Sequence, residues 1–167
     1  MSFEFNADDI FAMAEQIERN GAEFYRTACI GIADANARTF LDQLSKMEED
    51  HEKTFASIRA GLSQKEKTPT VFDPQDESAL YLKALADTKV FFEKQIDVCS
   101  MKEVLKAAIE AEKDSIVFYL GMKDIVPDAL GKKRIDDIIK EEMGHIRLLS
   151  KELVKLTAWR NWRISGK

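Results

Sequence analysis

Residues 138–149 read IIKEEMGHIRLL, and their spacing is the most informative feature of the chain. Steps of four, three and four residues lead from Ile138 through positions 142 and 145 to Leu149, which places all four positions on one face of an α-helix and predicts that this face is buried. Glu142 and His145 fall on the same face, one helical turn apart. Packing alone does not explain a carboxylate in a buried stripe, because desolvating an unpaired charge costs several kcal/mol. The stretch therefore predicts a helix with a polar site inside it.

The same pattern occurs at a fixed distance earlier in the chain. Residues 45–55, SKMEEDHEKTF, hold Glu48 and His51 with the same spacing. An offset of 142 − 48 = 94 residues carries this pair onto Glu142 and His145 without a gap. The offset also relates 14–25 (AEQIERNGAEFY) to 108–119 (AIEAEKDSIVFY), matching Glu18 with Glu112, Phe24 with Phe118, Tyr25 with Tyr119 and, further on, Asp34 with Asp128. Matches concentrated on polar residues predict two copies of one helical hairpin with a common chemical role.

Apolar residues at helical spacing extend over four long stretches of the chain. These stretches run from about 6 to 32, 34 to 62, 100 to 126 and 128 to 159. The third begins at Ser100 with Glu103 three residues on, the pattern of a capping box, and it ends before Pro127. A shorter amphipathic stretch, about 76–92, predicts an extra helix within a proline-marked linker. The predicted fold is all-α: a four-helix bundle of two hairpins, joined by a long crossover that contains the extra helix.

Composition narrows the class of protein. The 167 residues include 25 Lys and Arg against 30 Asp and Glu, a formal net charge of −5. Nucleic-acid binding is not expected, because affinity for phosphates comes largely from clustered Lys and Arg. No uncharged apolar run approaches the roughly 18 residues that span a bilayer, and the acidic start MSFEFNADD is unlike a secretory signal. We therefore expect no membrane association, a cytoplasmic location and one domain over residues 1–167.

The predicted helices each direct one carboxylate at the core, namely Glu18, Glu48, Glu112 and Glu142. Four buried carboxylates repel one another, so something positive must lie between them. Two divalent cations balance four carboxylates by formal charge, and His51 and His145 complete the coordination as neutral ligands. Carboxylate oxygen and imidazole nitrogen without thiolate favour iron or manganese. The two cysteines, Cys29 and Cys99, form no Cys-x-x-Cys motif and indicate neither a zinc site nor a rubredoxin-type site.

The pattern resembles that of ferritin-like di-iron and di-manganese carboxylate proteins. In those proteins two helices carry one Glu each, and the other two carry one Glu-x-x-His motif each. More closely, the four quoted segments resemble the metal-binding helices of the rubrerythrin family within the ferritin-like superfamily. The resemblance covers nearly the whole chain outside the crossover and the tail. It implies a homodimer and two iron ions, with manganese as the alternative metal. The ligands it implies are Glu18, Glu48, His51, Glu112, Glu142 and His145, with Glu48 and Glu142 bridging the metals.

The sequence departs from the better-known rubrerythrins in two respects. It lacks their rubredoxin-like cysteine module, so we expect an external electron donor such as a rubredoxin-like protein. Neither Ile109 nor Ser115, three residues on either side of Glu112, supplies the extra carboxylate of their asymmetric, peroxide-reducing site. The symmetric set of six residues looks more like a bacterioferritin-type centre or a manganese catalase.

The resemblance implies a non-haem di-iron oxidoreductase that reacts with hydrogen peroxide or dioxygen, by rubrerythrin-like peroxide reduction or by ferroxidase activity. Two alternatives stay open. One is manganese catalase-like disproportionation of peroxide, which needs no electron donor. The other is iron binding or storage without turnover. A metal-free helical interaction module is disfavoured because it would leave the buried charges uncompensated.

Tyr25 and Tyr119 lie two turns from Glu18 and Glu112 on the same helix faces. Their hydroxyls are candidates for holding a ligand carboxylate, which makes the two tyrosines candidate catalytic residues; packing in the core is the alternative. Five further acidic residues are interpreted as solvated surface: Glu15, Glu23, Glu49, Glu110 and Glu141. Five methionines are interpreted as core: Met13, Met47, Met101, Met122 and Met143. The tail TAWRNWRISGK is expected to pack against the bundle end or a subunit interface.

Overall fold

The structure, a computed structural model, describes residues 6–64, 67, 81–82, 97–126 and 128–165. These residues form four α-helices and one short 3-10 helix: α1 (Ala7–Gly31), α2 (Ala35–Ala60), α4 (Met101–Ile125), η2 (Asp128–Leu130) and α5 (Lys132–Ser165). The all-α prediction is confirmed for this part of the chain. The extra helix predicted at 76–92 lies outside the described residues, except for Tyr81 and Leu82, which are helical.

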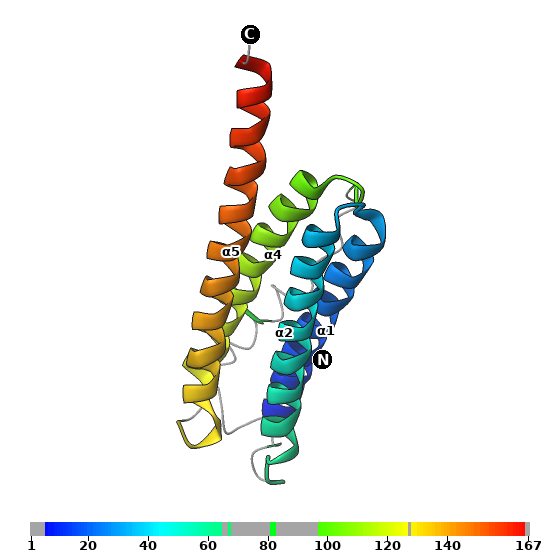
Figure 1. Cartoon of the computed structure of the whole chain (residues 1–167). Helices are drawn as coiled ribbons and strands as arrows, with labels where there is room; N and C mark the ends of the chain where they lie inside the picture. The colour runs from blue at the N-terminus through cyan, green and yellow to red at the C-terminus, as the bar shows by residue number, and fades with distance from the viewer. Residues whose placement is uncertain (1–5, 65–66, 68–80, 83–96, 127, 166–167) are drawn as a thin grey trace.

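The two halves of the sequence repeat form two helical hairpins. α1 packs along α2, and α4 packs along α5. The hairpins lie side by side, with α1 against α4 and α2 against α5 (Figure 1). α5 continues to Ser165, beyond the end predicted near 159, and its C-terminal part extends past the ends of the other helices in Figure 1. The side chains from 159 onward lie outside the described residues, so packing of the tail stays a prediction.

Two helix ends differ from the prediction. Ser100 begins α4 as expected, and its Oγ accepts a hydrogen bond from the backbone N–H of Glu103 at 3.4 Å. In place of the reciprocal bond of a capping box, the N–H of Ser100 donates to the carbonyl oxygen of Asp97 at 3.0 Å. α5 begins at Lys132 and not near 128. Gly131 has a φ of 106°, a conformation that other residues rarely adopt and that separates η2 from α5.

The core consists of two apolar layers with a polar layer between them. One apolar layer contains Ala7, Ile10, Phe11, Phe55, Phe118 and Ile135 among others. The other contains Tyr25, Ala28, Leu41, Leu44, Leu105 and Leu149 among others. The buried polar residues are Glu18, Ser45, Glu48, His51, Glu112, Ser115, Glu142 and His145. Along each of α1, α2, α4 and α5 they fall between the two apolar sets, so burial of large apolar side chains, about 1.5–3 kcal/mol each, holds the polar layer at mid-bundle.

Three predicted environments are wrong. Met47 and Met143, predicted as core, are 36% and 49% exposed. Glu15, predicted as solvated surface, has a side chain that is 12% exposed and pairs with Arg59 at 3.4 Å. The helix of each residue is assigned correctly. The error lies in how far each helix is rotated about its axis toward its neighbour. The spacing of apolar residues along one helix defines that rotation only coarsely.

Within the described part of the chain, no helix has a stretch that is both long enough and apolar enough to cross a lipid bilayer.

Candidate metal centre

Each of α1, α2, α4 and α5 contributes one buried carboxylate to the polar layer; these are Glu18, Glu48, Glu112 and Glu142, at 1%, 3%, 1% and 0% exposed. His51 on α2 and His145 on α5 join them at 4% and 0% exposed. Helical spacing puts these six side chains on buried faces, and hairpin packing brings the faces together. The structure therefore gathers all six residues that the sequence singled out.

The imidazoles face carboxylates of the opposite hairpin. His51 Nδ1 lies 3.0 Å from Glu142 Oε1, and His145 Nδ1 lies 3.1 Å from Glu48 Oε1. Each Nδ1 atom also lies near the carboxylate of the other helix in its own hairpin: His51 lies 3.5 Å from Glu18 Oε2, and His145 lies 3.6 Å from Glu112 Oε1. The two rings are stacked, with centroids 5.5 Å apart and planes at 17°. The 94-residue offset relates the contact of His51 with Glu142 to the contact of His145 with Glu48. The cluster therefore has an approximate two-fold symmetry that corresponds to the sequence repeat.

Two buried tyrosines hold the carboxylates of α1 and α4. The hydroxyl of Tyr25 donates to Glu112 Oε1 at 2.5 Å, and the hydroxyl of Tyr119 donates to Glu18 Oε1. Both tyrosines are 0% exposed. Burial and the neighbouring carboxylates raise both tyrosine pKa values, so both hydroxyls keep their protons near neutral pH. Each tyrosine therefore acts as a hydrogen-bond donor to the glutamate of the other hairpin.

Several polar atoms of the cluster lack a hydrogen-bond partner among the described residues. They are Glu48 Oε1, both carboxylate oxygens of Glu142, His51 Nδ1 and both ring nitrogens of His145. Although some of these atoms lie about 3 Å apart, their directions do not match a donor to an acceptor. An unpartnered buried polar atom costs about 1–3 kcal/mol. Donor atoms of this type, converging without partners, fit a cation.

The donor atoms form two overlapping groups, each with all its atoms within 4.8 Å of one another. One group is Glu18, Glu48, His51 and Glu142; the other is Glu48, Glu112, Glu142 and His145. Each group offers three carboxylates and one imidazole, and Glu48 and Glu142 belong to both. The arrangement can accommodate two cations that share two carboxylates.

Electrostatics show that the cluster needs positive charge. Burial would lower the pKa of His51, but the carboxylates of Glu142 and Glu18 outweigh burial and raise this pKa to about 12. The pKa of His145 is raised in the same way against the effect of its burial. Burial and the charges of neighbouring carboxylates raise the pKa of Glu142 to about 8 and also raise the pKa of Glu48. Protons therefore neutralise the cluster when no cation does.

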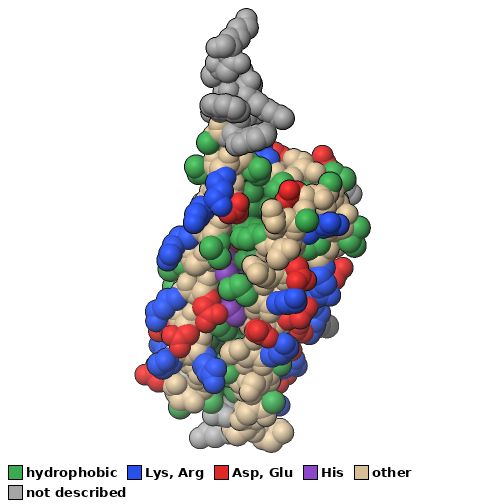
Figure 2. Space-filling view, viewed as in Figure 1, with side chains coloured by type: hydrophobic (Ala, Val, Ile, Leu, Met, Phe, Trp, Pro, Cys, Tyr) green, Lys and Arg blue, Asp and Glu red, His purple; other side chains and the backbone are tan. Residues whose placement is uncertain are grey.

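Sequence reasoning missed one residue at the site. Glu141, predicted as solvated surface, has a side chain that is 56% exposed, yet its Oε2 lies 2.9 Å from His51 Nε2. The signal in the sequence is a second Glu directly before Glu142. Helical spacing places that residue off the buried face, so the contact could not be inferred from the pattern. Figure 2 shows histidine atoms within the seam between α2 and α5 on the visible face of the molecule.

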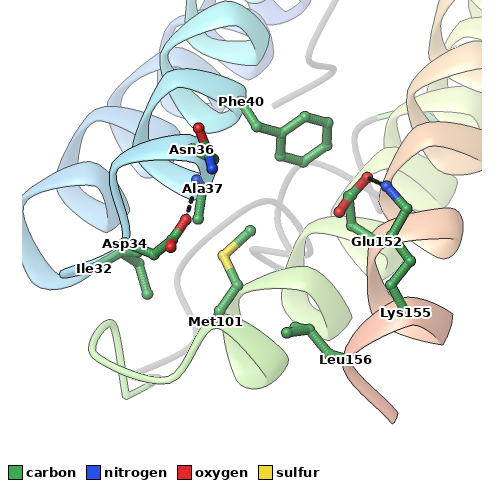
Figure 3. A pocket seen from close by; sticks show the side chains of 9 residues that line it. All are labelled: Ile32, Asp34, Asn36, Ala37, Phe40, Met101, Glu152, Lys155 and Leu156. Carbon is green, nitrogen blue, oxygen red and sulfur yellow. Dashed lines mark hydrogen bonds and ion pairs between the residues drawn. The ribbon is translucent and has the colours of Figure 1, made fainter. Parts of the chain in front are cut away.

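A separate cavity of about 520 Å³ lies near the turn between α1 and α2 (Figure 3). Its lining residues are Ile32, Asp34, Asn36, Ala37, Phe40, Met101, Glu152, Lys155 and Leu156. Its charged groups have local roles: Asp34 Oδ1 accepts from the N–H of Ala37 at 2.7 Å, and Lys155 pairs with Glu152 at 2.5 Å. None of the six clustered side chains lines this cavity.

Comparisons with known proteins identify the fold. No protein-family model and no curated protein sequence matches the chain. Among solved structures, the chain is similar to a Thermotoga maritima protein assigned provisionally as a ferritin-like diiron-carboxylate protein, with a TM-score of 0.65 and 24% sequence identity. The match covers 92% of this chain and 97% of that chain. The ferritin-like fold predicted from the sequence is thus confirmed, and the narrower resemblance to rubrerythrins stays a prediction.

Proposed function

We propose that this protein is a non-haem di-iron oxidoreductase that reacts with hydrogen peroxide or dioxygen. The observation that carries this proposal is the set of buried, unpartnered oxygen and nitrogen atoms at mid-bundle. Carboxylate and imidazole donors without thiolate suit iron, with manganese as the alternative. The assignment of the Thermotoga maritima protein as a diiron-carboxylate protein supports the same class.

The two groups of donor atoms give each residue a role. Glu18 and His51 would hold one metal ion, and Glu112 and His145 would hold the other. Glu48 and Glu142 belong to both groups, which suits carboxylates that bridge two metals. These residues would offer each metal ion three carboxylates and one imidazole. An iron ion held by them could bind an oxidant in addition.

When held by these residues, a pair of ferrous ions would supply the two electrons that, with two protons, convert hydrogen peroxide to two water molecules. The chain itself positions and shields this chemistry. Tyr25 and Tyr119 hold Glu112 and Glu18 by hydrogen bonds. The apolar layers on either side exclude bulk water, which strengthens every electrostatic interaction inside the cluster.

Electrons must return to the site from outside the chain. The sequence has no Cys-x-x-Cys motif that could hold a rubredoxin-type iron. We therefore include in the proposal a separate donor, such as a rubredoxin-like protein, and a homodimeric enzyme. Disproportionation of peroxide at manganese, or oxidation and holding of iron, would use the same cluster without such a donor.

Metal analysis and an anaerobic peroxide titration test the proposal. Aerobically purified protein should contain about two iron or manganese ions per chain. After anaerobic reduction, one peroxide per pair of ions should restore the near-ultraviolet absorbance of the oxidised iron centre. Oxygen released from peroxide without a reductant would indicate catalase activity instead. Oxidation of iron without repeated turnover would indicate iron handling.

Two variants locate the site. Glu48→Ala and His145→Ala should lose metal at one or both positions. Asp50→Ala is the matched control, because Asp50 lies next to His51 on α2 and its side chain is 74% exposed. Unchanged metal content in both site variants would contradict the proposal.

A further inference from the structure

The approximate two-fold symmetry of the cluster breaks next to the histidines. The 94-residue offset that interchanges the two hairpins relates Glu141 to Met47, because 141 − 94 = 47. One hairpin therefore carries a carboxylate directly before its Glu-x-x-His motif, where the other carries a thioether. Glu48 and Glu142, which follow these two residues, are identical under the same offset.

The structure shows the consequence for the outer ring nitrogens. His51 Nε2 has the carboxylate oxygen Glu141 Oε2 at 2.9 Å. His145 Nε2 is buried and has no hydrogen-bond partner in the described part of the chain. The inner nitrogens do not differ in this way, since their contacts with the opposite carboxylates are 3.0 Å for His51 and 3.1 Å for His145.

A carboxylate at this position changes a histidine as a ligand. By accepting a hydrogen bond from the Nε2–H group of His51, Glu141 fixes the tautomer in which Nδ1 presents its lone pair to the cluster. The same hydrogen bond holds the ring orientation and makes Nδ1 more basic. Partners of this kind typically contribute 10–100-fold to metal affinity. His145 receives no such contribution from the described residues.

We propose that Glu141 is a positioning residue for His51, which makes the metal position formed by Glu18, Glu48, His51 and Glu142 the tighter of the two. The two positions then fill in order, the His51 position first. This inference rests on the proposed function, because it requires that the cluster hold two cations. The two metal positions have the same types of donor atom. We infer that they differ in affinity because the half-exposed side chain of Glu141 contacts His51 and not His145.

One other contact also breaks the symmetry. Within α5, His145 Nδ1 lies 2.9 Å from Glu142 Oε2, whereas within α2 His51 Nδ1 lies 3.9 Å from Glu48 Oε2. A substitution at position 141 replaces none of these four side chains. A substitution there therefore isolates the contribution of the outer carboxylate.

The test is a Co²⁺ titration of metal-free full-length protein, followed by visible absorbance. The original protein should bind two Co²⁺ in two steps whose dissociation constants differ about 10–100-fold. Crystals grown with one equivalent of Co²⁺ should show anomalous scattering mainly at the His51 position. Glu141→Met, which copies Met47, should weaken the first step until the two steps merge and should divide the anomalous signal between the positions. Glu141→Gln keeps an acceptor oxygen and should retain part of the separation.

Glu110→Met is the matched control. Glu110 has a side chain that is 55% exposed, it pairs with Lys113 at 2.7 Å, and it precedes Glu112 by two residues on α4. Its replacement removes the same charge at the same exposure and should leave both steps unchanged. Circular dichroism should show the same helix content in all variants.

The outcomes separate the two proposals. Failure of the original protein to bind two Co²⁺ overturns the proposed function, and this inference with it. Two equal steps in the original protein overturn the inference alone, as do two steps that are unchanged in Glu141→Met. If the two Co²⁺ binding steps also merge in the Glu110→Met control, the inference is overturned, because the loss of a surface charge would then explain the change.

Discussion

The hydroxyl of Tyr25 on α1 donates a hydrogen bond of 2.5 Å to Glu112 Oε1 on α4, linking the two hairpins through the polar layer. Its counterpart under the sequence repeat, Tyr119, donates to Glu18 across the same interface. Each tyrosine therefore shares a helix with one of these glutamates and donates its hydrogen bond to the glutamate on the other helix. The two carboxylates that belong to only one group of donor atoms each, Glu18 and Glu112, are thus held in place by the opposite half of the molecule.

Replacing Tyr25 with Phe should weaken both stability and metal binding. The substitution leaves a buried carboxylate oxygen of Glu112 without its donor, and hydrogen bonds to charged groups contribute about 1.5–3 kcal/mol. Urea denaturation of the metal-free protein measures the loss of stability. Co²⁺ titration should show an affinity lowered about 10-fold or more at the Glu112 position. Tyr81→Phe is the control, since Tyr81 is 45% exposed; an equal effect there would contradict the prediction.

Glu48→Ala and Glu18→Ala should differ in how many metal ions they lose. Glu48 belongs to both groups of donor atoms, whereas Glu18 belongs to one. We therefore expect Glu48→Ala to lose both ions and Glu18→Ala to retain one. Elemental analysis after equilibration with Co²⁺ or Fe²⁺ and gel filtration counts the ions. Equal retention in the two variants would show that Glu48 is not shared.

The metal-free protein should become less stable as the pH rises from 5.5 to 8. The pKa of Glu142 is raised from 4.5 to about 8, so the folded state holds this proton where the unfolded state has released it. The raised pKa of His51, about 12 against 6.5, acts in the same direction above pH 6.5. When the folded state binds more protons than the unfolded state, stability falls with rising pH. Thermal unfolding of the metal-free protein at several pH values measures this slope.

Bound metal should oppose this loss of stability with rising pH. Cations compete with protons for the same donor atoms, so metal binding releases protons and strengthens as the pH rises. The increase in melting temperature on adding excess Co²⁺ should therefore be larger at pH 8 than at pH 5.5. A metal-induced increase that stays constant over this range would show that the bound ion does not replace the protons of the cluster.

Two glycines of the second hairpin should respond oppositely to alanine. Gly131 has a φ of 106°, and an added Cβ would lie 3.2 Å from Ile58 Cδ1. Gly131→Ala should destabilise by about 1–3 kcal/mol, because the backbone conformation is strained for alanine. Gly144 lies within α5, and nothing lies within 4 Å of an added Cβ. Gly144→Ala should stabilise the protein by about 0.5–1 kcal/mol. Chemical denaturation measures the change in free energy of unfolding for both variants. Changes of the same sign in the two variants would contradict the prediction.

Much of the fold and most of the cluster could be predicted from the sequence, because their signals are local. Three- and four-residue spacing puts Glu48 and His51 on one helical face whatever surrounds the helix. The cost of burying unpaired carboxylates then requires their convergence. Predictions that depend on the rotation of one helix against its neighbour were less successful, as the exposure of Met47 and Met143 shows.

The helices, their pairing into two related hairpins and the six residues of the cluster follow from the amino-acid sequence, since spacing, repeat and charge are properties of the chain alone. Which glutamate each tyrosine holds and which histidine meets Glu141 follow only from the packing of the hairpins. Those contacts join residues 87 to 101 positions apart on different helices. Such contacts depend on how the hairpins are rotated and shifted against each other, and that geometry comes from the packing of both apolar layers together.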